Sequence, residues 1–174
     1  DPAAQVRYES VYGAGLVELQ RYEEANRVLD SAIRSAESHP DVAYPSIAFN
    51  AKVDALRGSR RYDEALALAA EYLRSLPSDH LDSHLFQLRL SRGQIYEEVG
   101  QWNKAEAEYA QAVDYAHHVG FWRGVIQGGV LLATARLHSG ATQDALKEID
   151  DAIRANAHLP QELYYLPKSL GIKA

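Results

Sequence analysis

The histidines are the side chains whose chemistry is most readily tested from spacing, because imidazole is a common zinc ligand. His80 and His84 lie four residues apart, so on a helix both would share one face at a spacing that suits zinc. Asp79 and Asp82 lie close by. The His-Glu-x-x-His pattern is absent, however, and the chain has no cysteine that could add a thiolate ligand. We therefore expect no metal site, and we interpret histidines near loops as surface residues or as partners of helix C-termini.

Motifs for covalent or phosphate chemistry are also missing. The sequence contains neither the Gly-x-Ser-x-Gly turn of serine hydrolases nor a glycine-rich phosphate loop followed by lysine. Gly128 and Gly129 fall inside a helical pattern, where close helix packing explains them. Adjacent carboxylates such as Glu97 and Glu98 diverge around a helix and are usually solvated. We therefore predict that the chain is not an enzyme and uses no cofactor.

The overall composition excludes further classes. Of 174 residues, 47% are hydrophobic and 24% are charged, which is typical of an ordered globular protein. The net charge of −6 disfavours a nucleic-acid partner and an anionic membrane surface. No apolar run approaches the ~18 residues that a membrane-spanning helix needs. A chain without cysteine tolerates either redox environment, so the compartment stays open, with the cytoplasm favoured. The absence of methionine indicates a segment of a longer chain or a processed product.

One repeat organises the whole chain. Four segments align without gaps at residues 20–25, 60–65, 101–105 and 141–145. Their shared alanines are each 40 residues apart: Ala25, Ala65, Ala105 and Ala145. Apolar residues recur at fixed offsets on both sides of these alanines, with the spacing of one helical stripe upstream and one downstream. Each unit is therefore predicted to be a helix, a tight turn and a second helix.

The ends of these helices follow from local signals. We expect Gly58, Gly100 and Gly140 to mark turns, because glycine takes a positive φ at a helix end without steric cost. Prolines near 40–45, 77 and 160 separate the units, since proline lacks the amide donor of a helix interior. The predicted helices span 3–19, 22–38, 44–58, 61–75, 81–99, 102–118, 122–139, 142–157 and 161–173. No alternation typical of strands occurs.

This pattern resembles the signature of the tetratricopeptide repeat (TPR) family. The third unit carries the resemblance best, in Gly93, Tyr96, Gly100, Trp102 and Ala105. The resemblance implies an all-α fold, an α-α superhelix or solenoid of four helix-turn-helix repeats plus a terminal helix. We expect a single domain over 1–174, with repeats at 3–40, 44–78, 81–119 and 122–158 and an extra helix at 161–173. The period of 40 exceeds the family's 34, as in longer-armed variants from bacterial signalling and regulatory proteins, and Arg136 stands where a core residue is expected.

The resemblance also implies a function, namely binding of a protein or peptide in a concave groove lined by the first helix of each repeat. Each polar side chain on that face either contacts the partner or is simply solvated. The residues disfavour the chaperone-binding members of the family, because the lysine that holds the peptide's terminal carboxylate is missing and Asp54 would repel that carboxylate. The candidate partner-binding residues are Asn50, Asp54, Arg57, Gln87, Gln94, Glu97, Gln127, Thr134 and His138.

Three further expectations concern an alternative function, self-association and the aromatic residues near loops. The alternative function is a sensory or regulatory module of a larger bacterial signalling or transcription-regulatory protein. Solenoid ends without polar caps tend to stack, so self-association through the terminal helices is possible. Several aromatic residues lie near the loops between units and either anchor a partner or fill the gaps between repeats. These are Tyr44, Phe121, Trp122, Tyr164 and Tyr165.

Overall fold

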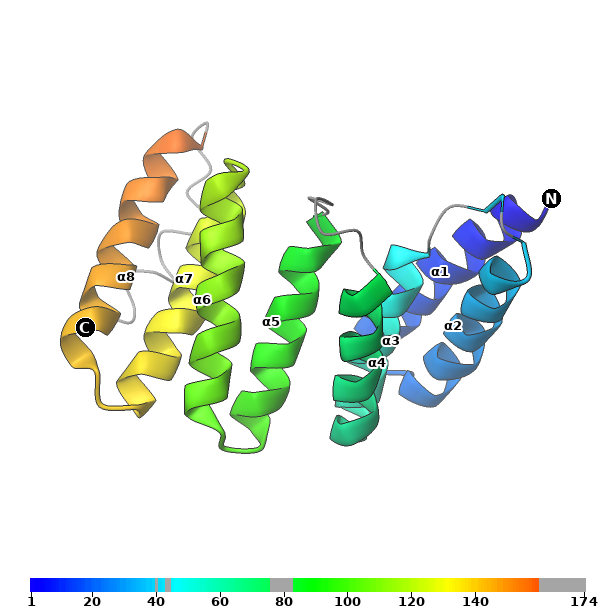
Figure 1. Ribbon diagram of the computed structural model, residues 1–174, viewed down its shortest axis with the longest axis horizontal. Helices are drawn as coiled ribbons and strands as arrows, with labels where there is room; N and C mark the ends of the chain where they lie inside the picture. The colour runs from blue at the N-terminus through cyan, green and yellow to red at the C-terminus, as the bar shows by residue number, and fades with distance from the viewer. Residues whose placement is uncertain (40, 43–44, 76–82, 160–174) are drawn as a thin grey trace. The chain divides into compact units, whose positions relative to one another are not determined.

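A computed structural model describes residues 1–39, 41–42, 45–75 and 83–159 of the chain. All regular structure in these ranges is helical (Figure 1). Eight α-helices are followed by a short 3-10 helix, Asn156–His158. The α-helices are α1 (Pro2–Glu18), α2 (Tyr22–Glu37), α3 (Ser46–Gly58), α4 (Tyr62–Ser75), α5 (Ser83–Glu98), α6 (Trp102–His118), α7 (Trp122–His138) and α8 (Thr142–Ala155).

The helix ends agree with the predicted ones to within two residues for all eight α-helices. The ninth predicted helix, 161–173, lies outside the described residues. No helix in the described part of the chain is both long enough and apolar enough to cross a bilayer.

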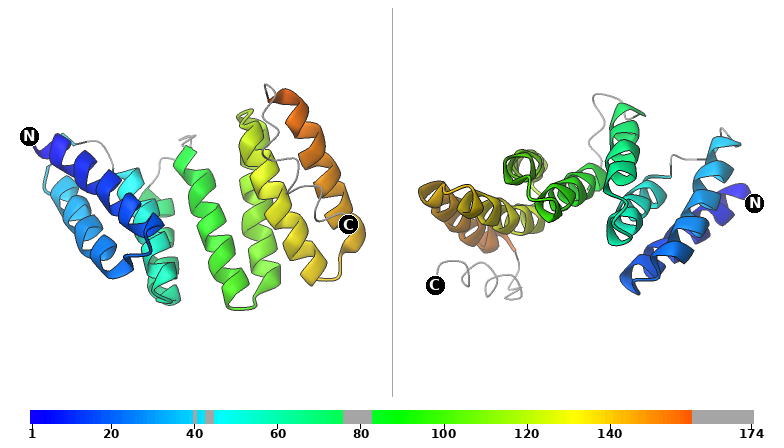
Figure 2. Two further views of the ribbon diagram at one scale, coloured as in Figure 1. Left: turned by 180° about the vertical axis from the view of Figure 1, so that it is seen from behind. Right: turned by 90° about the horizontal axis from the view of Figure 1, so that it is seen from below.

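The helices form two compact units, Asp1–His80 and Leu81–Ala174. In the first, here called unit 1, α1 packs on α2, and α3 packs on α1, α2 and α4. In the second, called unit 2, α5, α6, α7 and α8 pack in chain order, and α5 also touches α7 (Figure 2). Within each unit, helices joined by a three-residue turn run antiparallel, namely α1 with α2, α3 with α4, and α5 to α8 in succession.

The same turn joins one helix to the next at five places. The second of its three residues has a positive φ, and the third donates its backbone N–H to a carbonyl five positions back, which is the hydrogen-bond pattern of a Schellman motif. The positive-φ residues are Gln20 (58°), Arg60 (60°), Gly100 (74°), Gly120 (69°) and Gly140 (81°). The prediction was therefore correct for Gly100 and Gly140.

The prediction was wrong for Gly58, which is the last residue of α3 and lies before the turn. Arg60 holds the left-handed conformation in its place. Gly58 has another role, because a Cβ there would lie 2.3 Å from the ring of Tyr22 on α2. This glycine lets α3 approach the start of α2.

Glycines on α1 and α5 face larger residues on the second helix of the same pair. A Cβ at Gly13 would lie 2.4 Å from Leu29, and one at Gly93 would lie 2.3 Å from the ring of Tyr109. These two pairs occupy the same register, 80 residues apart. The marker alanines are buried, with exposures between 0% and 2%, which explains why they recur at the closest approach of paired helices.

Candidate functional site

The candidate residues of unit 1 lie on α3. Asp54 and Arg57 form a half-buried ion pair, with 3.7 Å between Oδ1 and Nε. Asn50 lies one turn before Asp54, on the same side of the helix, and is only 6% exposed. The most accessible polar groups of this face are therefore the carboxylate and guanidinium rather than the Asn50 amide.

The candidate residues of unit 2 lie on α5 and α7, which contact each other. Gln87 and Gln127 are equivalent positions 40 residues apart, as are Gln94 and Thr134. Gln127 is exposed, and the other three are half-buried. The Thr134 hydroxyl donates to the carbonyl of Val130 at 2.9 Å, within its own helix. Side-chain amides therefore recur at matching heights on neighbouring first helices.

Two other candidate residues contact the second helices. Glu97 accepts a hydrogen bond from the Tyr109 hydroxyl at 2.8 Å, which ties α5 to α6. His138, at the end of α7, stacks on Trp102 with ring centroids 3.8 Å apart and planes 6° apart. Both side chains thus have a structural contact in addition to any role toward a partner.

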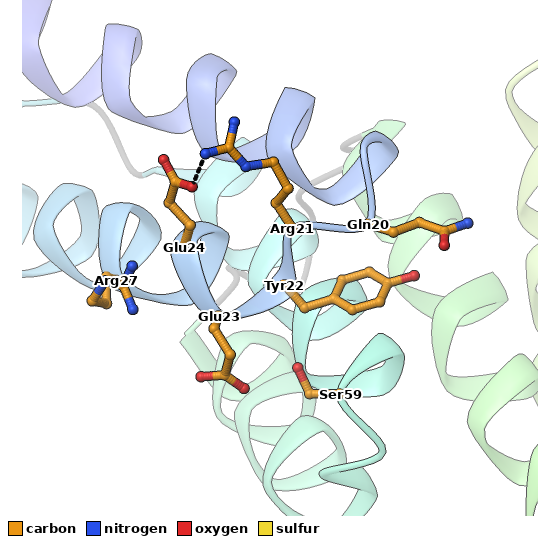
Figure 3. A pocket seen from close by; sticks show the side chains of 7 residues that line it. All are labelled: Gln20, Arg21, Tyr22, Glu23, Glu24, Arg27 and Ser59. Carbon is orange, nitrogen blue, oxygen red and sulfur yellow. Dashed lines mark hydrogen bonds and ion pairs between the residues drawn. The ribbon is translucent and has the colours of Figure 1, made fainter.

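An open hollow recurs at the turn between paired helices. In unit 1 it measures ≈ 490 Å³ and lies around Tyr22, beside an Arg21–Glu24 ion pair and Ser59 (Figure 3). In unit 2 a hollow of ≈ 400 Å³ lies around Trp102, with Lys104 and Ser139 in its lining. Tyr22 and Trp102 are equivalent positions 80 residues apart, so one structural feature of the repeat produces both hollows. Trp102 was part of the sequence resemblance to the TPR signature, but neither hollow was predicted.

Charged clusters fasten helices together inside both units. In unit 1, Lys52 of α3 pairs with Asp30 of α2. In unit 2, Glu108 is only 7% exposed, and its two oxygens accept from Arg89 and Arg92 of α5 at 2.9 Å each. Buried charges occur where they are paired, because desolvation otherwise costs several kcal/mol per ion. Glu108 was not predicted as a buried charge. The sequence shows only that Arg89 and Arg92, three residues apart, share one face of a helix.

The most extended cluster surrounds Arg136, the residue that departed from the family pattern. Its Nε lies 3.1 Å from Glu106 of α6, and one terminal nitrogen lies 2.5 Å from Glu148 of α8. Burial alone would lower the pKa of Arg136, but the hydrogen bonds and charges of the two carboxylates outweigh it and raise that pKa. Arg136 therefore joins three helices through charge, where a core residue would join them by packing.

Two of the predicted loop aromatics, Phe121 and Trp122, lie in the described part of the chain, and both make ring contacts within unit 2. Trp122 is half-buried, packs against the core of unit 2 and stacks on His158, and Phe121 meets Phe86 edge-to-face at 5.2 Å. Phe121 thus packs against the preceding repeat, whereas the stacking of Trp122 on His158 lies within its own repeat. Tyr44, Tyr164, Tyr165 and His80 lie outside the described residues. Within the described residues, no three His, Asp or Glu side chains gather where they could hold a metal ion.

Comparison with known proteins identifies the fold. No family model and no curated protein matches the sequence. A crystal structure from Podosopora anserina, described as kinesin light chain nearly identical TPR-like repeats, superposes with a TM-score of 0.70 at 16% sequence identity. The match covers 99% of this chain and 83% of the other. The chain therefore has the fold of TPR-like helical repeats, which confirms the predicted all-α solenoid class.

Proposed function

We propose that the protein is a non-catalytic scaffold that binds a protein segment along the first helices of its repeats. The observation that carries this proposal is the recurrence of amide side chains at equivalent positions of α5 and α7, at Gln87 and Gln127 and near them at Gln94. An amide both donates and accepts, so it can bond the backbone of an extended peptide whatever the peptide's sequence. The repeat fold supports the proposal, because its extended surfaces commonly bind other proteins.

The remaining candidate residues contribute in two ways. On α3, Asp54 and Arg57 supply charge, and Asn50 supports them from the same side of the helix. On α5 and α7, Glu97, Thr134 and His138 extend the polar surface at its edges. Their own contacts within the protein hold these side chains in fixed positions, which lowers the entropy lost on binding.

The test uses peptides selected from a random displayed library against the wild-type protein. Each selected peptide is titrated by fluorescence anisotropy against Gln87→Ala/Gln127→Ala and against Gln111→Ala/Gln143→Ala. The control pair carries the same chemical change on exposed positions of α6 and α8. We expect the first pair to weaken binding at least tenfold, about 1.4 kcal/mol, while the control pair binds like the wild type. Equal affinities for all three proteins would contradict the assignment of the site.

We propose in addition that the protein self-associates through the outer face of α1. Tyr8 and Val11 on this face are 68% and 58% exposed, and a Cβ on Gly15 would contact nothing within 4 Å. The equivalent positions of α3, Ala48 and Ala51, are 0% and 7% exposed because α3 packs on α1 and α2 at this face. A face that packs against another helix pair elsewhere in the repeat is thus open on α1. A second copy of α1 supplies a matching apolar face, as the common two-fold dimer requires.

A further inference from the structure

Unit 1 contains a hollow of ≈ 410 Å³ between α2 and α4, with α3 as its floor. The amide of Asn26 on α2 lines this hollow and is only 5% exposed. Neither its oxygen nor its nitrogen has a hydrogen-bond partner among the residues that the structure describes. A buried amide without a partner is unfavourable, so the hollow is suited to a ligand that supplies hydrogen bonds.

Unit 2 shows what occupies the same place there. In the repeat register, 80 residues apart, Asn26 corresponds to Glu106, Leu56 to Arg136 and Leu68 to Glu148. The guanidinium of Arg136 fills the position in unit 2 and is bonded by both carboxylates. In unit 1 the two leucines line the hollow instead, and neither can bond the amide. The position that an arginine side chain fills in unit 2 is therefore without an arginine at the equivalent place in unit 1.

The charges that line the hollow come from three acidic residues, Asp30, Glu64 and Glu71, and three basic ones, Lys52, Arg61 and Arg74, whose Nε donates to the carbonyl of Ala70. Among its acidic residues, Asp30 pairs with Lys52, and Glu64 pairs with Arg61 at 2.7 Å. Glu71 on α4 also lines the hollow, but it forms no hydrogen bond or ion pair within the described part of the chain. Its carboxylate is therefore available to an incoming positive group.

We infer that this hollow binds an arginine side chain of a partner protein segment. Asn26 Oδ1 and the Glu71 carboxylate accept hydrogen bonds from the guanidinium, as Glu106 and Glu148 do from Arg136. The arginine methylenes lie along Leu56 and Leu68, which suits a side chain with an apolar stem and a charged end. The Asn26 Nδ2 donates to a backbone carbonyl of the same segment. Arginine is favoured over lysine because its planar fork bonds two acceptors at once.

This site is separate from the surface proposed above for partner binding. Leu56 and Lys52 lie about 200° around α3 from Asn50 and Asp54, because each residue turns the helix by 100°. Loss of binding at one surface therefore leaves the other intact. Binding of arginine at the Asn26 hollow is therefore tested independently of binding along the first helices.

The test is a titration followed by ¹H–¹⁵N NMR at the Asn26 side-chain amide. The probes are the capped tripeptides acetyl-Gly-Arg-Gly-amide and acetyl-Gly-Lys-Gly-amide. We expect the arginine peptide to shift the Asn26 resonances saturably, and the lysine peptide to bind at least about fivefold more weakly. An absent or non-saturating shift, or equal affinity for both peptides, would overturn the inference and leave the amide to water.

Two variants tie the binding to the proposed contacts. Glu71→Gln removes the accepting charge, and we expect it to weaken the arginine peptide about tenfold. Its matched control is Glu37→Gln, an exposed carboxylate on α2 that does not line the hollow, which we expect to bind like the wild type. The triple variant Asn26→Glu/Leu56→Arg/Leu68→Glu copies the unit 2 cluster into unit 1, and it should fold with wild-type helicity and no longer bind the peptide. Retained binding in a folded triple variant, or equal effects of the two glutamine variants, would contradict the site.

Discussion

At the scale of single residues, the five turns share one backbone conformation, which different residue types adopt. Glycine occupies the positive-φ position in three turns, whereas Gln20 and Arg60 occupy it in the other two. A left-handed conformation costs an L-residue with a Cβ roughly 1–2 kcal/mol, and glycine does not incur this cost. Unit 1 therefore stores backbone strain at two turns that unit 2 lacks.

The first prediction is that Arg60→Gly stabilises the protein. We expect a gain of about 1 kcal/mol in the free energy of unfolding, partly offset by the greater entropy of glycine in the unfolded chain. Urea denaturation followed by circular dichroism measures the change. Arg60→Ala is the matched control, since it removes the exposed side chain but keeps the strain, and it should give no gain. A glycine variant no more stable than the alanine variant would show that this turn is unstrained.

The positive-φ positions of the turns could be predicted from the sequence where glycine occupies them, but not where another residue does. Gly100 and Gly140 were recognised because glycine favours positive φ, but Arg60 carries no such mark, so the nearest glycine was chosen instead. Strict use of the register would have corrected this choice, because residues 20, 60, 100 and 140 are equivalent. Asn26 was not predicted as a site residue, because the sequence does not show that its buried amide has no hydrogen-bond partner in the folded protein.

At the scale of helices, size complementarity across each pair sets how closely the helices approach. Gly93 on α5 lies under the ring of Tyr109 on α6, and the equivalent fourth-repeat positions, Ala133 and Ile149, share one buried cluster. A larger first-helix residue thus accompanies a smaller second-helix residue at the same register. The pair, rather than either residue, is the unit that the repeat preserves.

The second prediction follows from this pairing. Gly93→Ala should destabilise the protein by about 1–3 kcal/mol, because the new Cβ would lie 2.3 Å from the Tyr109 ring. In the Tyr109→Ile background, which copies the fourth repeat, the same substitution should cost less, and a double-mutant cycle measures the difference. Gly15→Ala on α1 is the control, since its Cβ meets nothing within 4 Å, and it should stabilise by about 0.5–1 kcal/mol through helix propensity alone. Equal losses in both backgrounds would refute the pairing.

Helices were also the scale at which the sequence was most informative. Their bounds were predicted to within two residues, because the 40-residue period averages over four copies of the same boundary signals. The contacts between helices were harder to predict from the sequence. Arg136 looked like a defect in the pattern, since nothing in its own segment shows that Glu106 and Glu148 lie 30 residues before it and 12 after it on two neighbouring helices.

At the scale of the whole molecule, the proposed self-association depends on the exposed face of α1. Tyr8 and Tyr12 stack on each other with ring centroids 5.9 Å apart, and Val11 and Leu19 continue the same stripe. Contiguous apolar surface of this kind is favourable to bury, by roughly 25 cal/mol for each Å² removed from water. Because α1 presents the stripe on one side only, association through it stops at a dimer and does not extend into a filament.

The last prediction concerns this dimer. Sedimentation velocity over micromolar to millimolar concentrations should show a shift of the wild type from monomer to dimer, and Tyr8→Ser/Val11→Ser should remain monomeric throughout. Leu137→Ser/Leu146→Ser removes two exposed leucines from α7 and α8, at 41% and 38% exposure, and should behave like the wild type. Both variants replace two exposed apolar side chains with serine, so a difference between them assigns the interface to the face of α1 rather than to exposed apolar residues in general. A wild type that stays monomeric, or a Tyr8/Val11 variant that still dimerises, would refute the role of this face.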